Sequence, residues 1–132
     1  MAKKFLKKII AQTSEDLRII SALCSGSKVR TSEIKFLKNN KVFLVTVERE
    51  SKEDQKLNKI LKSIIKFDYV ENSKSINIDQ NEKKNILELL TIENFKKKDK
   101  FEIILLFSKN KAITLQTEVI EVTLENIEEI ND

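Results

Sequence analysis

The chain has no histidine, proline or tryptophan, and only one cysteine and one glycine among its 132 residues. Without histidine, the Ser-His and Cys-His nucleophile pairs of common hydrolases and the zinc sites built on Cys and His are excluded. The single glycine excludes the Gly-rich phosphate loops and the nucleophile elbow, which need more than one. We therefore expect no catalytic apparatus of these kinds, no metal site and no cofactor.

Long apolar segments and paired cysteines are also absent. No uncharged apolar run approaches the roughly 20 residues that span a bilayer, and Lys7 and Lys8 interrupt the apolar residues near the N-terminus where a signal peptide would continue. The single cysteine, Cys24, cannot form a disulfide within the chain, which favours a reducing compartment. These features predict a cytoplasmic protein that does not contact a membrane.

Charged side chains are abundant and only slightly unbalanced. Lys and Arg number 25 against 21 Asp and Glu, which gives a formal net charge of +4. A basic surface can attract nucleic acid, and lysines cluster at residues 3–8 and 96–100, near Phe5 and Phe95. However, nearly all the cations are lysine, whereas base recognition favours the planar fork of arginine. Solvated lysines are the favoured interpretation, and weak nucleic-acid binding is an alternative.

The clearest local signal is a helix near the N-terminus. Thr13 or Ser14 is a suitable N-cap, and apolar side chains with helical spacing follow, including Leu17 and Ile20. Gly26 can adopt the positive φ that ends a helix. Cys24 at the end of this helix is expected to be a small buried side chain, because a thiolate nucleophile needs a more positive neighbourhood.

In the rest of the chain, apart from one segment, apolar and polar residues alternate as they do in strands. Residues 82–90 place Ile86, Leu87 and Leu90 at helical spacing, which predicts a second helix. The expected strands are residues 7–11, 29–37, 42–49, 61–70, 75–79, 101–107, 112–117 and 118–124, with hairpin turns at 38–41 and 108–111.

These elements predict an α+β fold in a single domain, residues 1–132. Two similar strand–helix–hairpin–strand halves, about 5–70 and 74–127, suggest an internal duplication. The fold would be a mostly antiparallel sheet with two helices packed against it. Residues 42–45 and 103–107 are apolar on both faces, so each face needs cover. Helices would cover one face. The other face would be covered by a curled sheet, a sandwich or a second subunit, and the second subunit leads to the hypothesis of a homodimer.

Four polar residues on the predicted strands are candidates for binding. They are Arg49, Asp68, Glu118 and Glu121. A carboxylate pair among them could bind a hard cation or act in acid–base catalysis. The more ordinary interpretation is that they form ion pairs that hold the sheet, for example Glu118 and Glu121 with lysines across a strand.

Several short motifs occur in a distinctive order. They are Ile9-Ile10-Ala11, Ser14-Glu15-Asp16-Leu17 with Ile19-Ile20-Ser21-Ala22, Phe67-Asp68, and Ala112-Ile113 with Leu115, Glu118, Ile120, Glu121 and Leu124. In this order they resemble an uncharacterised domain-of-unknown-function family, found mainly in alphaproteobacteria, of short single-domain proteins. The resemblance covers roughly residues 5–127 and implies no activity, so it transfers no functional residue. Arg49 matches an arginine that closes a hairpin strand in that family, but the aromatic residues expected after it are absent.

The sequence favours a non-enzymatic intracellular module that binds a protein partner or itself through a sheet face or edge. One alternative is weak nucleic-acid binding through the lysine clusters. Another is a small enzyme that uses carboxylates and lysine, for which a deep pocket lined by Asp68, Glu118 or Glu121 would be the sign.

Overall fold

The computed structural model describes residues 8–50, 60–79 and 81–130. Ten strands and one α-helix make up the described chain, with two single 3-10 turns, η1 (Thr31–Glu33) and η2 (Lys38–Asn40). In chain order the other elements are β1 (Lys8–Ala11), α1 (Ser14–Cys24), β2 (Ser27–Arg30), β3 (Ile34–Leu37), β4 (Val42–Glu50), β5 (Ile60–Phe67), β6 (Val70–Ile76), β7 (Ile86–Lys97), β8 (Lys100–Phe107), β9 (Lys111–Thr117) and β10 (Val122–Ile130).

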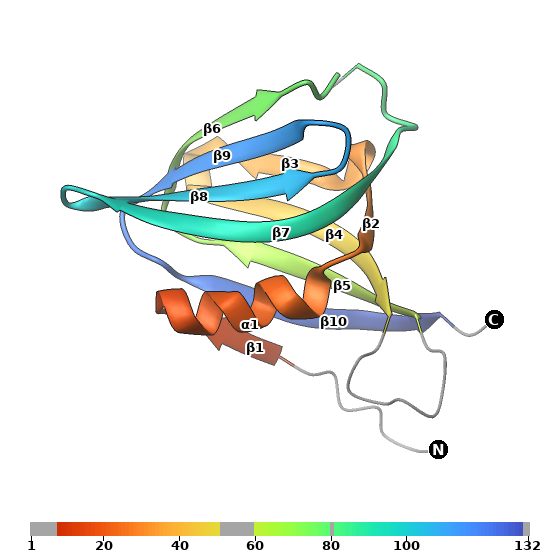
Figure 1. Cartoon of the computed structure of the whole chain (residues 1–132), viewed down its shortest axis with the longest axis horizontal. Coiled ribbons are helices and arrows are strands. Elements are labelled where there is room, and N and C mark those ends of the chain that lie inside the picture. Colours follow the sequence, from red (N-terminus) through yellow and green to blue (C-terminus); the bar gives the residue numbers. More distant parts are fainter. Residues whose placement is uncertain (1–7, 51–59, 80, 131–132) are drawn as a thin grey trace.

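All ten strands belong to one sheet that folds over on itself. Its order is β1-β10-β5-β4-β2-β7-β8-β9-β6, and β3 pairs with β4 beside this path. Figure 1 shows β7, β8, β9 and β6 as one layer in front of β4, β5 and β10, with β2 passing from one layer to the other. A single hydrophobic core with residues from both layers lies between them. Every strand pair is antiparallel.

Helix α1 covers one side of the two layers. Thr13 is its N-cap, and the side-chain oxygen accepts a hydrogen bond from the backbone N–H of Asp16 at 3.1 Å. Leu17, Ile20, Ser21 and Cys24 are buried, as the apolar stripe predicts. The helix packs on β7 and β1, and Gly26 follows it with a φ of 84°. The prediction of this helix is confirmed.

Strands β4 and β5 show the alternation that builds the core. Side chains at every second position of β4, such as Val45 and Val47, are fully buried, and so are Ile65 and Phe67 in β5. The intervening residues Leu44 and Ile64 are partly buried on the outer face. The hairpin between β3 and β4 forms at the predicted turn, where Lys41 adopts the left-handed conformation with a φ of 56°.

The prediction of a second helix at residues 82–90 is wrong, and with it the α+β class with two helices. These residues lead into β7, and the described fold is mostly antiparallel sheet with one α-helix. Strand β7 contains a β-bulge between Leu89 and Thr91, because Leu89 pairs with Phe107 but Thr91 already pairs with Leu106. The extra residue changes the phase of the alternation, so the buried positions fall at 87, 89 and 92. The helical spacing that suggested a helix belongs to Ile86, Leu87 and Leu90, and of these Ile86 and Leu90 are exposed on β7, 54% and 44%. The matching helix that suggested the duplication of residues 5–70 and 74–127 is therefore lost.

Other strand limits also differ from the prediction. The expected strand at residues 29–37 is divided into β2 and β3 by η1. The last strand runs from Val122 to Ile130 rather than over residues 118–124. The two strands that are apolar on both faces bury one face completely, at Phe43 and Ile103 for example, and their outward residues, such as Ile104, are partly buried within the single chain.

No helix in the described part of the chain is long and apolar enough to cross a membrane.

Candidate functional site

Among the described residues, no strand pair joins the two layers on the side opposite α1. There the edge of β3 faces the edge of β6, and we call this gap the β3–β6 seam. Within the described residues β3 pairs only with β4, and β6, the last strand of the sheet, pairs only with β9. Both strands thus present unpaired backbone groups toward the seam, the usual template for the addition of another strand.

Hydrogen bonds fix both ends of the seam. At one end, the backbone N–H of Val70 donates to the carbonyl of Lys41 at 2.8 Å. At the other end, Thr31 binds the loop that follows β6: its backbone N–H donates to the carbonyl of Asn85 at 3.0 Å, and its hydroxyl donates to the carbonyl of Glu82 at 2.6 Å. The chain on either side of β3 is therefore joined to β6 and to the loop after it.

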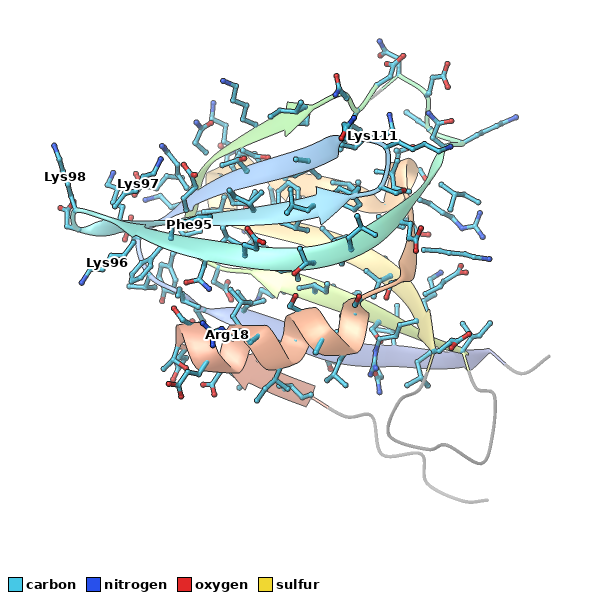
Figure 2. The ribbon with its side chains drawn as sticks, in the orientation of Figure 1. Arg18, Phe95, Lys96, Lys97, Lys98 and Lys111 are labelled. Carbon is cyan, nitrogen blue, oxygen red and sulfur yellow. The ribbon has the colours of Figure 1, made fainter. Side chains whose placement is uncertain are left out.

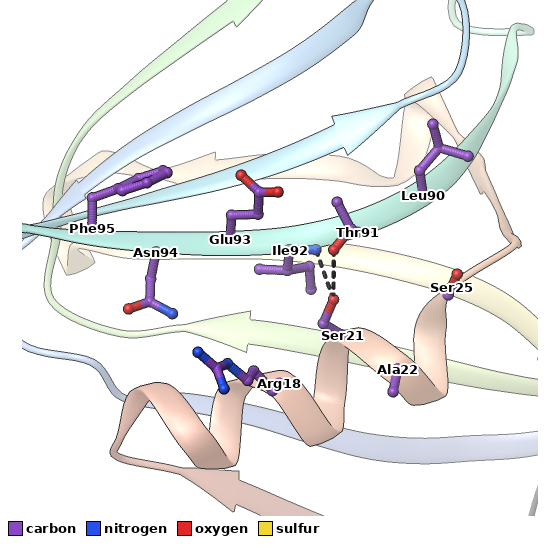
Figure 3. A pocket seen from close by; sticks show the side chains of 10 residues that line it. All are labelled: Arg18, Ser21, Ala22, Ser25, Leu90, Thr91, Ile92, Glu93, Asn94 and Phe95. Atoms are coloured by element: carbon purple, nitrogen blue, oxygen red, sulfur yellow. Dashed lines mark hydrogen bonds between the residues drawn. The ribbon is translucent and has the colours of Figure 1, made fainter.

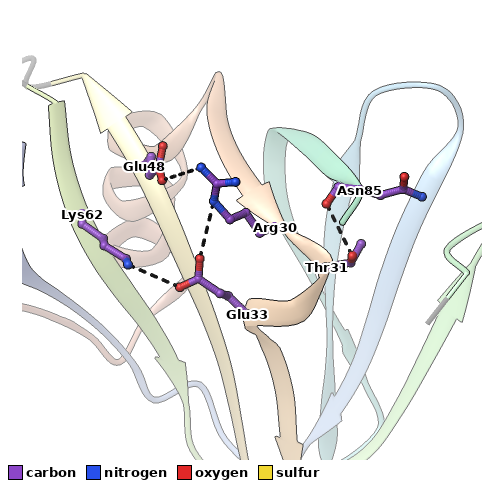
Figure 4. A network of polar contacts seen from close by, with 6 residues as sticks. All are labelled: Arg30, Thr31, Glu33, Glu48, Lys62 and Asn85. Carbon is purple, nitrogen blue, oxygen red and sulfur yellow. Dashed lines mark hydrogen bonds and ion pairs between the residues drawn. The ribbon is translucent and has the colours of Figure 1, made fainter. Parts of the chain in front are cut away.

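A network of ion pairs stabilises the bend between β2 and β3 (Figure 4). At this bend the chain turns away from the layer of β7, β8, β9 and β6. Arg30 contacts Glu48 at 3.4 Å and Glu33 at 3.9 Å, and Lys62 contacts Glu33 at 3.6 Å. These side chains are partly exposed, and exposed pairs contribute at most about 1 kcal/mol each. Their role is to orient η1, from which β3 leaves along β4.

A cavity of about 510 Å³ opens at the seam. Its volume lies in the range of roughly 300–1,000 Å³ that is typical of ligand sites. Apolar side chains from β3, β9 and the loop after β6 line it together with polar ones: Ile34, Phe36, Ile78 and Ile113, and Thr31, Ser32, Ser73, Ser75 and Lys83.

The strand register explains why the seam is hollow. Phe36 pairs with Phe43 across β3 and β4, so it faces the core, and its ring lies 6.1 Å from that of Phe43. On the other side, Ser73 and Ser75 pair with the buried residues Leu115 and Ile113, so they face inward too. Bulky side chains on β3 thus oppose small hydroxyls on β6, which leaves the space unfilled.

The structure brings together three of the four residues predicted from the sequence. The backbone N–H of Asp68 donates to the carbonyl of Glu121 at 2.9 Å, and that of Glu118 to the carbonyl of Tyr69 at 3.2 Å. Each carboxylate has a separate side-chain partner: Lys66 for Asp68 at 3.7 Å, Lys41 for Glu118 at 3.2 Å and Gln12 for Glu121 at 2.8 Å.

These carboxylates do not converge on one point. No group of three acidic or cysteine side chains that could hold a metal is found in the described ranges. None of the three carboxylates lines the seam cavity or the cavity along α1 described below. Their side-chain contacts, with Lys66, Lys41 and Gln12, join the ends of strands.

Arg49 lies at the C-terminal end of β4, and only 2% of its surface is exposed. Its Nε donates to the hydroxyl of Ser63 at 3.2 Å and its Nη2 to Oδ1 of Asn126 at 3.0 Å. Ser63 also donates to Asn126 at 2.7 Å, so one cluster joins β4, β5 and β10. Arg49 pairs with Leu61, whereas Phe43 pairs with Phe67 beside Asp68. Six residues of strand therefore separate Arg49 from the three carboxylates, about 20 Å.

Sequence reasoning missed Ser63 and Asn126 as partners of Arg49. The available signal was Ser63 at an inward position of β5, between the buried residues Leu61 and Ile65. A serine at a core position needs a hydrogen-bond partner. The cluster is a structural tie, because it is buried where three strands meet.

A second cavity, of about 600 Å³, lies along α1 and β7 (Figure 3). Ser21 closes its floor: the hydroxyl accepts a hydrogen bond from the backbone N–H of Ile92 at 2.8 Å and lies 3.1 Å from Oγ1 of Thr91. Arg18 and Glu93 both line the cavity, so its charges are mixed.

The lysine cluster at the β7–β8 turn lies beside Phe95, as Figure 2 shows, with Arg18 on α1 nearby. Phe95 is 47% exposed. Lys97 binds Glu102 at 3.1 Å and Lys100 binds Glu71 at 3.0 Å. Two of the cations are thus matched by carboxylates. The other predicted cluster lies largely in residues 3–7, outside the described residues.

Comparison with known proteins gives one match, to a family. A family described as "Protein of unknown function (DUF2948)" matches residues 7–131. No curated protein and no solved structure is similar enough to the chain to count as a match. The match covers nearly the whole chain and agrees with the resemblance seen in the order of the sequence motifs. The chain belongs to the DUF2948 family of proteins of unknown function.

Proposed function

We propose that this chain is a non-enzymatic binding module of the cytoplasm that takes up an extended segment of a partner protein at the β3–β6 seam. One observation carries the proposal: two unpaired strand edges face each other across a cavity with an apolar lining. Cys24, the single cysteine of the sequence, is buried, which suits a reducing compartment.

Strand addition explains how the seam would bind. An extended segment that pairs with the free edge of β6 gains main-chain hydrogen bonds, and every second side chain points toward the cavity. Ile34, Phe36 and Ile113 would contact those side chains, and each apolar side chain that becomes fully buried contributes about 1.5–3 kcal/mol. Leu37 and Ile76, 43% and 49% exposed, border the seam on its outer side and add apolar surface there.

The arrangement of polar groups supports binding rather than catalysis. Asp68, Glu118 and Glu121 are held by separate partners at the rim, away from the seam cavity. The hydroxyls of Ser73 and Ser75 face the cavity from a strand whose register places them there. They can donate to or accept from a bound main chain without further chemistry.

The test is a search for extended peptides that bind the full chain, with the binding site mapped by NMR. Peptides of about ten residues with apolar side chains at alternate positions should shift the amide resonances of β3 and β6. Ser75→Leu, which places a larger apolar side chain in the cavity against the bound segment, should abolish this binding. Ser108→Leu, a matched change in the turn between β8 and β9, should leave it intact. Resonance shifts elsewhere, or equal binding by both variants, would refute the proposal.

Self-association is a related proposal, in which the segment comes from a second copy of the chain. Exposed apolar residues at the seam, such as Leu37 and Ile76, support it. Sedimentation at micromolar concentration distinguishes the two cases. If the chain is a dimer and Ser75→Leu is a monomer, the seam binds a second copy of the chain. If the unmodified chain is a monomer, the seam binds a different protein.

Weak nucleic-acid binding is the second candidate function. Phe95, Arg18 and the lysines of the β7–β8 turn lie together and could stack on a base and contact phosphates (Figure 2). A gel shift with single-stranded RNA and DNA at low salt tests it. Loss of binding in Phe95→Ala would support this function, and no shift at low salt would end it.

A further inference from the structure

We infer that the segment bound at the β3–β6 seam is acidic, with apolar side chains toward the cavity alternating with Asp or Glu on the outer side. This inference rests on the proposed function and specifies the chemistry of the partner. Its basis is the charge of the residues that border the seam.

Lysines border the seam on both strands and at its mouth. Lys35 pairs with Leu44 and Lys74 with Thr114, and the outward register of these pairs places both lysines on the outer face, where they are exposed. Lys83 lies at the mouth of the cavity and is exposed as well. An inserted strand would have its outward side chains between those of Lys35 and Lys74.

Three carboxylates near this border are already engaged. Glu71, at the start of β6, binds Lys100 at 3.0 Å, and Glu118 binds Lys41 at 3.2 Å. Asp79, in the loop after β6, accepts a hydrogen bond from the backbone N–H of Asn81 at 2.9 Å. Lys35 and Lys74 therefore give the outer border a positive charge that acidic side chains would complement.

Cross-strand pairing sets the size of the expected effect. An opposite-charge pair directly across two strands strengthens binding by roughly 1.5- to 5-fold, and like charges weaken it comparably. With Lys35 and Lys74 both in reach, an acidic peptide should bind about 2- to 25-fold more tightly than a neutral one. Salt should reduce this difference, because exposed charges are screened beyond about 10 Å at 0.1 M ionic strength.

A competing explanation is that these lysines only keep the free edges from pairing with other chains. Edge lysines often have this role. If the lysines have only that role, the affinity for a peptide should not depend on the sign of the peptide's charge. Peptides that differ only in charge therefore distinguish the two explanations.

The experiment uses three peptides of equal length with the same apolar residues at alternate positions and Glu, Gln or Lys between them. Their affinities for the full chain are measured by calorimetry at low and high salt. We expect the Glu peptide to bind most tightly and the Lys peptide most weakly. The preference should vanish in the double variant Lys35→Glu with Lys74→Glu. It should persist in Lys96→Glu with Lys98→Glu, which changes the net charge equally at the β7–β8 turn.

Each other result has a distinct meaning. Equal binding of all three peptides would overturn the acidic partner and leave the proposed function standing, whereas no binding by any of them would overturn the proposed function itself. An acidic preference that survives Lys35→Glu with Lys74→Glu, or that falls equally in both double variants, would overturn the assignment to the seam. A twelve-nucleotide single strand of DNA that competes with the Glu peptide and depends on Lys35 and Lys74 would overturn the peptide as the partner.

Discussion

A larger apolar side chain placed in the seam cavity should stabilise the protein, whereas a larger side chain in a packed core destabilises it. Ser75 lines the cavity of about 510 Å³ from β6. Leucine at this position replaces a hydroxyl by three more carbon atoms that face Ile34, Phe36 and Ile113. At about 0.8 kcal/mol per buried CH₂, and allowing for partial exposure, Ser75→Leu should raise the free energy of unfolding by about 1 kcal/mol.

Ser27 provides the matched comparison. It is a serine on a strand too, but it is 2% exposed, and no cavity described above includes it. Overpacking of such a site costs about 1–3 kcal/mol. Urea denaturation of both variants measures the difference, and thermal melting should show a rise of roughly 3 °C for Ser75→Leu. If Ser75→Leu loses as much stability as Ser27→Leu, the cavity is not there and the reasoning fails.

Three further predictions concern the elements that position the seam. Asn126→Ala should cost about 1–3 kcal/mol in urea denaturation, because the buried guanidinium of Arg49 loses an acceptor; no loss would show that the cluster does not hold β4 to β10. Thr13→Ala should cost about 1 kcal/mol through the lost N-cap, with Thr13→Ser near neutral by the same assay. The hydrogen bond with Glu71 raises the pKa of Lys100 above its ordinary value of 10.5. The pair therefore stabilises the folded protein fully at pH values below 10.5, and this stabilisation is lost as the pH rises through the raised pKa. In Glu71→Gln this alkaline loss should disappear from a pH series of melting temperatures, and an unchanged profile would argue against the pair.

Local signals were enough to predict α1 and the hairpin of β3 and β4. In α1, the N-cap Thr13, the apolar stripe and Gly26 all agree, so no tertiary contact is needed to decide between helix and strand. In the hairpin, Asn and Lys residues occupy a turn in which Lys41 adopts a positive φ.

The failure at β7 has a cause that a single sequence does not reveal. The bulge after Leu89 depends on its partner β8, which lies later in the chain. The hydroxyl of Ser21 then accepts the backbone N–H of Ile92, so the helix stabilises the segment beyond the bulge. Long-range contacts of this kind override the helical spacing of Ile86, Leu87 and Leu90.

The seam was outside the reach of sequence reasoning for a similar reason. Ser73 and Ser75 stand in a polar stretch that alternates with Lys74, which gives no hint that they face a cavity. Their position follows from the register of β6 with β9, and the free edges exist only because the sheet folds over on itself. The sequence pattern identified the four polar residues, but the distance of Arg49 from the three carboxylates follows only from the pairing of β4 with β5.

Hydrogen exchange of the backbone amides of β6, with and without the Glu peptide, tests the uptake of a strand at the seam most directly. Amides of β6 that do not bond to β9 should exchange more slowly in the presence of the peptide, because a new strand accepts their hydrogen bonds. Strand β1, at the opposite end of the strand order and away from the seam, should exchange at an unchanged rate. Unchanged exchange along β6 at saturating peptide, or slowing confined to β1 or to the groove between α1 and β7, would contradict it.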